Sequence, residues 1–265
     1  MSGDFDYGGQ RANMEDDSMR GTLAAQARVV WPAEREIIRR RYGRQLGRVL
    51  DLACGTGEIL GRLRRDFACS QAIGIDLFDG HLRHAEPPVV RADGYLLPFP
   101  DGSFDLVLVR HVLQALPDPV GLLAEARRVL RPGGRIHVVA EDYLGLFFDA
   151  DDAAVENHFP EVQPLFRAEG GTDLYQGRRA LRHLRAAGFE QVAIDPLFVD
   201  NQSADRDALA SMFRFWGAGY AATLARMTGA SVAEMERRFE LMAENAADPD
   251  RYCAWLLFAL DGTKS

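Results

Sequence analysis

One stretch constrains the fold more than any other: an apolar run that ends in an acid, a short glycine turn, and the start of a helical pattern. This stretch spans residues 49–60, with the sequence Val-Leu-Asp-Leu-Ala-Cys-Gly-Thr-Gly-Glu-Ile-Leu. Gly55 and Gly57 carry no Cβ, so the backbone of such a turn can approach a ligand closely. The unpaired N–H groups at a helix start favour anionic or electron-rich groups. The stretch therefore predicts a strand, a ligand-binding loop and a helix, in that order.

Short apolar runs alternate with helical patterns along most of the chain. Near-continuous apolar strands between helices are typical of a parallel sheet that helices cover on both faces. Several runs end in an acid, as at Asp76 and Asp93, so carboxylates collect where the strands end. We predict strands at residues 48–52, 71–76, 89–93, 104–109, 135–140, 189–196 and 252–260, helices at 58–67, 80–85, 120–130 and 177–187, and two or three helices within 203–247.

Two further segments interrupt this rhythm. Residues 21–42 have a helical pattern with a break at Pro32, which fits the first turn of a second helix. Residues 141–176 show no clear period and are rich in aromatic and acidic residues. A connection of that length is more often a lid or a binding loop than a linker. We therefore expect an N-terminal helical cap segment at residues 1–45 and a main domain at residues 46–265, with cap insertions at residues 141–176 and 197–251.

Composition excludes several kinds of partner. The formal net charge of −8 argues against wholesale binding of nucleic acid, and the arginine clusters are expected on solvated helix faces. Three cysteines without CxxC spacing argue against a disulfide framework and against a zinc site. No apolar run approaches the roughly 20 residues that span a membrane, and the first residues lack the order of a signal peptide. We expect a cytoplasmic protein without a membrane or nucleic-acid partner.

Four features stand in order along the first half of the chain. Residues 51–57 (Asp-Leu-Ala-Cys-Gly-Thr-Gly) form a glycine motif with Ala53 at its first glycine position, and Asp76 lies 19 residues after its last glycine. Asp93 directly precedes a glycine, and residues 130–134 (Leu-Arg-Pro-Gly-Gly) form a turn before the fifth predicted strand. Together these features resemble the class I S-adenosylmethionine-dependent methyltransferases, near the small-molecule branch that includes quinone-biosynthesis-like enzymes.

The resemblance implies a doubly wound α/β fold: a seven-stranded, mostly parallel, Rossmann-like sheet with an antiparallel last strand and a helical cap. It implies S-adenosylmethionine as the methyl donor, S-adenosylhomocysteine as the product, and no metal. Asp76 would then take the ribose hydroxyls and Asp93 the adenine amino group. The methyl group would pass to an O, N or C atom of a small-molecule acceptor, secondary-metabolite-like or quinone-like, that is neutral or cationic when bound beside the acidic rim.

Residues after the fourth and fifth strands are expected where methyl transfer takes place. His111 is a candidate general base, or a residue that orients its loop. The acids and the tyrosine at 141–143 could orient the acceptor or accept its proton, or could cap the loop. His158 is expected at the surface of the lid, and the other histidines have no assigned role. The expected catalytic residues are His111, Glu141, Asp142 and Tyr143; the expected cofactor-binding residues are Tyr7, Asp51, Ala53, Cys54, Gly55, Gly57, Asp76, Leu77, Asp93, Gly94, Arg110 and His111.

Two other functions share part of this pattern. A nicotinamide-dependent oxidoreductase also needs a glycine loop and an acid after the second strand, but residues 55–61 have GxGxxxG spacing in place of GxGxxG. A protein of the same fold could bind S-adenosylmethionine without methyl transfer, for example to catalyse a cyclisation. Both a monomer and a homodimer are compatible with the aromatic residues at 208–224.

Overall fold

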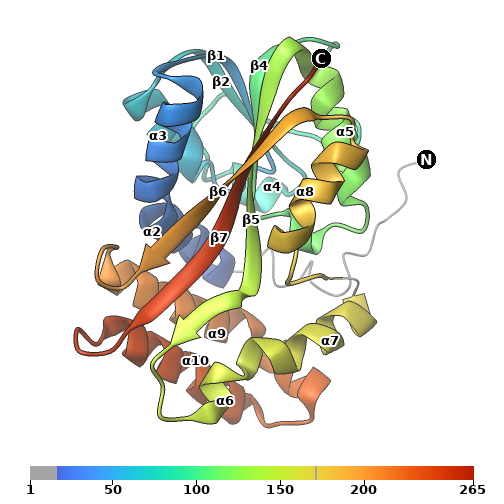
Figure 1. Cartoon of the computed structure of the whole chain (residues 1–265). Helices are drawn as coiled ribbons and strands as arrows, with labels where there is room; N and C mark the ends of the chain where they lie inside the picture. The colour runs from blue at the N-terminus through green and yellow to red at the C-terminus, as the bar shows by residue number, and fades with distance from the viewer. Residues whose placement is uncertain (1–16, 171) are drawn as a thin grey trace.

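The strands form one sheet of seven in the order β3-β2-β1-β4-β5-β7-β6 (Figure 1). The computed structural model describes residues 17–170 and 172–265. Strand β7 is antiparallel to both of its neighbours, and the pairs from β3 to β5 are parallel. The doubly wound fold with an antiparallel last strand is therefore confirmed. The strands are β1 (Gln45–Leu52), β2 (Ala68–Asp76), β3 (Val89–Arg91), β4 (Phe104–Arg110), β5 (Leu130–Phe148), β6 (Glu190–Asp200) and β7 (Cys253–Thr263).

Helices cover both faces of the sheet, and a separate group of helices lies beyond its carboxyl edge (Figure 1). One face carries α2 (Asp17–Tyr42) and α3 (Glu58–Asp66), and the other carries α5 (Pro119–Val129) and α8 (Gly177–Ala186). Short elements α4 (Asp79–Leu82) and η1 (Leu113–Ala115) follow β2 and β4. The helices beyond the carboxyl edge, here called the cap, are α6 (Ala153–Glu156), α7 (His158–Gly170), α9 (Arg206–Thr228) and α10 (Val232–Ala247).

The order of the strands reverses between β1 and β4. Strand β1 pairs with β2 on one side and with β4 on the other, so the chain moves outward in both directions from this point. In open α/β sheets such a reversal leaves a crevice at the carboxyl ends of the two strands, where ligands bind. The loops after β1 and β4 therefore frame the expected site.

Helix α2 differs from its predicted form because it continues through Pro32 without a break. The proline removes one backbone donor and would cost a few kcal/mol in an isolated helix. Val30 and Trp31 before it and Ile38 after it are all buried. Burial of each such side chain contributes roughly 1.5–3 kcal/mol, so packing on the sheet and the cap offsets the lost hydrogen bond.

Strand β5 is also longer than predicted, because it runs past Glu141 to Phe148. Its second half pairs with the start of β7, where Leu146 lies opposite Trp255, after an irregular register that begins at Glu141. The predicted lid of residues 141–176 is thus the end of β5 followed by α6 and α7. The bulge breaks the two-residue period, which is why this strand could not be seen in the sequence.

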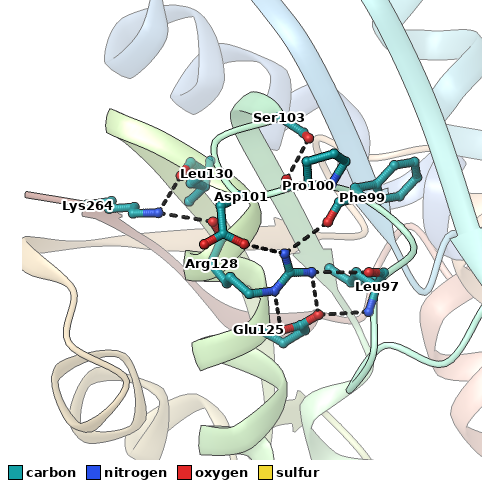
Figure 2. A network of polar contacts seen from close by, with 9 residues as sticks. All are labelled: Leu97, Phe99, Pro100, Asp101, Ser103, Glu125, Arg128, Leu130 and Lys264. Atoms are coloured by element: carbon teal, nitrogen blue, oxygen red, sulfur yellow. Dashed lines mark hydrogen bonds and ion pairs between the residues drawn. The ribbon is translucent and has the colours of Figure 1, made fainter.

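A polar network fixes the loop that leads from the pocket edge into β4 (Figure 2). Arg128 on α5 donates to both oxygens of Glu125 at 2.8 and 2.9 Å and to Asp101 at 2.6 Å. The same guanidinium donates to two backbone carbonyls of residues 97–103. Lys264 donates to the Arg128 carbonyl at 3.0 Å, which ties the end of β7 to the same corner.

Among the described residues, no helix combines the length and the apolar character needed to cross a bilayer.

Candidate active site

A pocket lies where the strand order reverses, between the carboxyl ends of β1, β2 and β4 and the cap. Side chains from α2, α7, α9 and α10 complete its walls. Of the residues expected to bind the cofactor, those described here that line the pocket are Asp51, Ala53, Cys54, Gly55, Asp76, Leu77, Asp93, Gly94, Arg110 and His111. Gly57 is not part of the lining: it is the N-cap of α3. Tyr7 lies outside the described residues.

The glycine loop after β1 takes a left-handed backbone at three positions. The φ angles are +61° at Ala53, +55° at Gly55 and +74° at Gly57, a region that disfavours residues with a Cβ. A Cβ at Gly55 would also lie 2.8 Å from Leu23 of α2, on the pocket wall. Burial raises the pKa of the Cys54 thiol far above its usual value, so this cysteine is not an activated nucleophile.

Asp76 at the end of β2 holds the glycine loop in place. Its Oδ2 accepts from the Gly55 N–H at 2.8 Å, and its Oδ1 accepts from the Phe78 N–H at 2.9 Å. The Nδ1 of His81 lies 3.6 Å from the same carboxylate. Each carboxylate oxygen has two lone pairs, so Asp76 can still accept hydrogen bonds from hydroxyl donors in the pocket.

Asp93 and Gly94 form the edge of the pocket after β3. Asp93 is exposed, and its Oδ1 accepts from the Tyr95 N–H at 2.9 Å in a short turn. A Cβ at Gly94 would lie 2.9 Å from Leu122, so glycine permits close packing of this turn on α5. The turn thus presents a carboxylate at the mouth of the pocket.

Asp51 is a buried carboxylate with an unused acceptor. It is 2% exposed at the end of β1, and its Oδ2 has no hydrogen-bond partner among the described residues. Burial raises its pKa to about 7, against the opposing attraction of the Arg110 guanidinium. An unpartnered buried carboxylate facing a pocket favours a ligand that carries positive charge or several donors.

Arg110 is bound to α2 in a buried ion pair that the sequence reasoning missed. Its Nη2 lies 2.6 Å and its Nε 2.7 Å from the two oxygens of Glu34, which is fully buried. The Nε2 of His137 lies 3.3 Å from Glu34 as well. Glu34 stands four residues after Val30 and four before Ile38, which is the signal that could have placed it on the buried face of the helix. Arg110 therefore faces the pocket with its charge already compensated.

His111 and Glu141 form a buried pair in the lining of the pocket. His111 Nδ1 lies 2.8 Å from Glu141 Oε1, and the side chains are 6% and 1% exposed. Neither His111 Nε2 nor Glu141 Oε2 has a hydrogen-bond partner among the residues the structure describes. Gln114 donates to the His111 carbonyl at 2.9 Å and holds the loop.

The backbone of His111 is strained, with φ at +52°. A non-glycine residue in this region costs on the order of 1–3 kcal/mol and is found mainly at functional sites. With Nδ1–H directed at the carboxylate, Nε2 is left as a proton acceptor. The arrangement can therefore accept a proton from a ligand in the pocket.

The side chains of Asp142 and Tyr143 point to opposite faces of the sheet, because neighbouring side chains on a strand alternate in direction. Tyr143 lines the pocket, and its ring centroid lies 5.5 Å from that of Trp216. Asp142 is not part of the pocket lining: it pairs with Arg178 of α8 at 2.5 and 2.6 Å. Both oxygens of Asp142 therefore hold α8 outside the pocket lining, and its catalytic role stays a prediction that this geometry does not support.

Aromatic side chains of the cap enclose the far end of the pocket. His158, expected at the surface, is fully buried among them, which corrects that expectation. Phe148 and Phe213 pack on each other in the core, with ring centroids 5.3 Å apart. We call this end of the pocket the aromatic chamber; it is lined by Tyr143, His158, Phe159, Phe166, Trp216, Tyr220 and Phe239.

Comparison with known proteins identifies the class. A family model described as "Methyltransferase domain" matches residues 50–138. A ubiquinone/menaquinone biosynthesis C-methyltransferase of Desulfotalea psychrophila is 32% identical, over 49% of this chain and 67% of that protein. The chain belongs to the class I S-adenosylmethionine-dependent methyltransferases. Within them it lies in the quinone-biosynthesis-like branch, so the resemblance seen in the sequence is confirmed.

Solved structures show the same fold at low identity. The putative methyltransferase in a Haloferax volcanii complex with the Trm112 activator has a TM-score of 0.58 and 16% identity, covering 95% of this chain and 97% of that one. The [4+2]-cyclase SpnF has a TM-score of 0.51 and 24% identity, with coverages of 85% and 79%. The chain spans about half to two thirds of the length of the first curated relatives that it matches.

Proposed function

We propose that the protein transfers a methyl group from S-adenosylmethionine to an O, N or C atom of a small-molecule acceptor. One observation carries this proposal: the His111–Glu141 pair lies in a single pocket with the glycine loop on one side and the aromatic chamber on the other. A proton acceptor between a nucleoside-binding loop and an apolar cavity has the geometry that methyl transfer to a nucleophile needs.

The carboxylates that line the pocket fit S-adenosylmethionine. The carboxylate of Asp51, whose Oδ2 has no hydrogen-bond partner among the described residues, suits the positively charged methionine end, and Asp76 can accept from the two ribose hydroxyls. The exposed carboxylate of Asp93 suits the adenine amino group at the pocket edge. When bound, the cofactor supplies a methyl group that is already activated on a sulfonium.

The chain's own residues then align the acceptor and move its proton. His111 Nε2 accepts the proton that the acceptor loses, and the Glu141 carboxylate stabilises the imidazolium that forms. The apolar rings of the cap line one end of the pocket, which limits the access of water to the reacting atoms. Methylation at O or N of a neutral acceptor, or at an acidic C–H, is compatible with this base.

Binding of S-adenosylmethionine for a reaction other than methyl transfer, such as a cyclisation, is the alternative function. The likeness to the cyclase SpnF is a likeness of fold, and it shows that this fold occurs in an enzyme named for a different reaction. Membership of the methyltransferase family argues against the nicotinamide-dependent oxidoreductase considered from the sequence.

We expect the protein to bind S-adenosylmethionine with a micromolar Kd in calorimetry at pH 8, and to release S-adenosylhomocysteine when an acceptor is added. NADH serves as the control ligand and is expected not to bind. Binding of S-adenosylmethionine without any formation of S-adenosylhomocysteine, across a panel of naphthols, naphthoquinols and aromatic amines, would favour the non-transferring alternative. Absence of binding by folded protein would refute both.

Cofactor affinity is expected to depend on pH through Asp51. Because its pKa is raised to about 7, the carboxylate is charged at pH 8 and largely protonated at pH 6. Affinity for the cationic cofactor should therefore fall about tenfold from pH 8 to pH 6. Asp51→Asn should bind weakly at both pH values and lose most of this dependence. Titration calorimetry at the two pH values measures it, and an equal pH dependence in wild type and variant would contradict the assignment.

A further inference from the structure

His158 is a polar side chain in apolar surroundings. It is the first residue of α7 and is fully buried. Neither ring nitrogen has a hydrogen-bond partner among the described residues. Burial lowers its pKa to about 4, and the positive charge of Arg238 acts in the same direction. The imidazole is therefore neutral at pH 7, with one N–H donor and one nitrogen acceptor.

Leaving the two ring nitrogens of His158 without hydrogen bonds is energetically unfavourable. A buried donor or acceptor without a partner costs about 1–3 kcal/mol. The ring packs edge-on against Phe159 and Phe239, each with centroids 5.0 Å away, so packing fixes its orientation. In native proteins a buried polar group is seldom left without a hydrogen-bond partner, so we expect the His158 imidazole to bind a group from outside the protein.

The position of His158 shows what can bind there. It lines the same pocket as His111 and Glu141 but lies on the cap side, in the aromatic chamber. Among the side chains of α7, α9 and α10 that the structure describes, no charged one is part of that lining. A charged group held against these helices would lose its hydration without a counter-ion, whereas a neutral aromatic molecule would find ring faces and edges.

Resting on the proposed function, we propose that His158 recognises the acceptor: it hydrogen-bonds a hydroxyl or carbonyl group of a neutral aromatic molecule that packs in the aromatic chamber. The ring of the acceptor contacts Tyr143, Phe159 and Trp216, whose centroids lie 5.1–6.1 Å from one another. Its polar group meets the imidazole at the cap end, and its reacting atom faces His111. His158 thus selects for a polar substituent remote from the methylated atom.

The test uses the full chain saturated with S-adenosylhomocysteine and three probes. 2-Naphthol has a hydroxyl group, 2-methylnaphthalene has nearly the same shape without a polar atom, and phenyltrimethylammonium is a cation. In calorimetry, wild type should bind 2-naphthol about tenfold more tightly than 2-methylnaphthalene. His158→Phe should abolish this preference and leave the affinity for S-adenosylhomocysteine unchanged.

Two further variants separate recognition from packing. His158→Gln keeps a donor and an acceptor and should retain part of the preference for 2-naphthol. Phe166→Leu changes another buried chamber residue without removing a polar group, and it should weaken both naphthalene probes alike.

The proposal is overturned if His158→Phe and His158→Gln both keep the full preference, if neither naphthalene probe binds, or if wild type binds phenyltrimethylammonium more tightly than 2-naphthol. These outcomes leave S-adenosylhomocysteine binding by wild type intact. Loss of that binding would instead contradict the proposed function.

Discussion

His111→Asn is expected to lower kcat by about 10²–10⁴-fold, because the site loses the proton acceptor that faces the bound acceptor molecule. Asparagine is chosen because it tolerates a left-handed backbone, and His111 has a φ of +52°. The measurement is the rate of S-adenosylhomocysteine formation with the best acceptor from the panel at pH 8.

Two comparisons make the result specific to the His111–Glu141 pair. Glu141→Gln should reduce kcat by a smaller factor, because it keeps the shape of the partner but removes the charge that stabilises the imidazolium. His84→Asn, at an exposed histidine outside the pocket, should not change the rate. A His111→Asn enzyme within threefold of the wild-type kcat would show that the acceptor needs no base from this residue.

Glu34→Gln is expected to lower the free energy of unfolding by about 3–5 kcal/mol at pH 7, because it removes the charged carboxylate that is hydrogen-bonded to the buried Arg110 guanidinium. The Arg110 side chain is 9% exposed and that of Glu34 is fully buried, so water cannot replace the lost interaction. Urea denaturation followed by circular dichroism measures the change. Arg131→Ala, which removes an exposed ion pair with Asp105, is the control and should cost no more than about 1 kcal/mol.

The Glu34–Arg110 pair also makes the stability of the fold depend on pH. Although burial raises the pKa of Glu34, Arg110 and His137 outweigh it and hold the pKa at about 2, below its usual 4.5. A carboxyl group with a lowered folded-state pKa stabilises the fold above its unfolded pKa, and this stability is lost as pH falls toward 2. Wild type should lose more stability than Glu34→Gln between pH 5 and pH 2. Equal losses, or a cost below 1 kcal/mol at pH 7, would show that Glu34 is replaceable.

The sheet and the cofactor half could be predicted because their signals are local. Acids at the ends of apolar runs placed Asp51, Asp76 and Asp93 at one edge of a parallel sheet, and the structure brings all three to one pocket. The glycine loop needs a left-handed backbone that few residues allow, so its residue types are tightly limited.

The acceptor half could not be predicted, because it depends on contacts between distant segments. His158 is buried only because α7 packs against α9 and α10, and no local pattern in the sequence reports that packing. Glu34 and Arg110 are 76 residues apart, and their pairing makes sense only once α2 lies on the sheet. The continuation of α2 through Pro32 likewise depends on tertiary burial that outweighs local propensity.

Several expectations stay predictions. They are the roles of the candidate cofactor-binding and catalytic residues, Tyr7 included, the oligomeric state, the cellular compartment, and the division into a cap segment at residues 1–45 and a domain at residues 46–265 with insertions at 141–176 and 197–251.

The central claim is that one pocket holds the methyl donor and directs it at the His111–Glu141 pair and the aromatic chamber. A crystal structure of the complex with S-adenosylhomocysteine tests this most directly. We expect the ribose on Asp76, the adenine beside Asp93, and the sulfur facing the space between His111 Nε2 and Tyr143. A sulfur atom that points away from His111, or a ligand bound outside the pocket at the carboxyl ends of β1 and β4, would contradict the account.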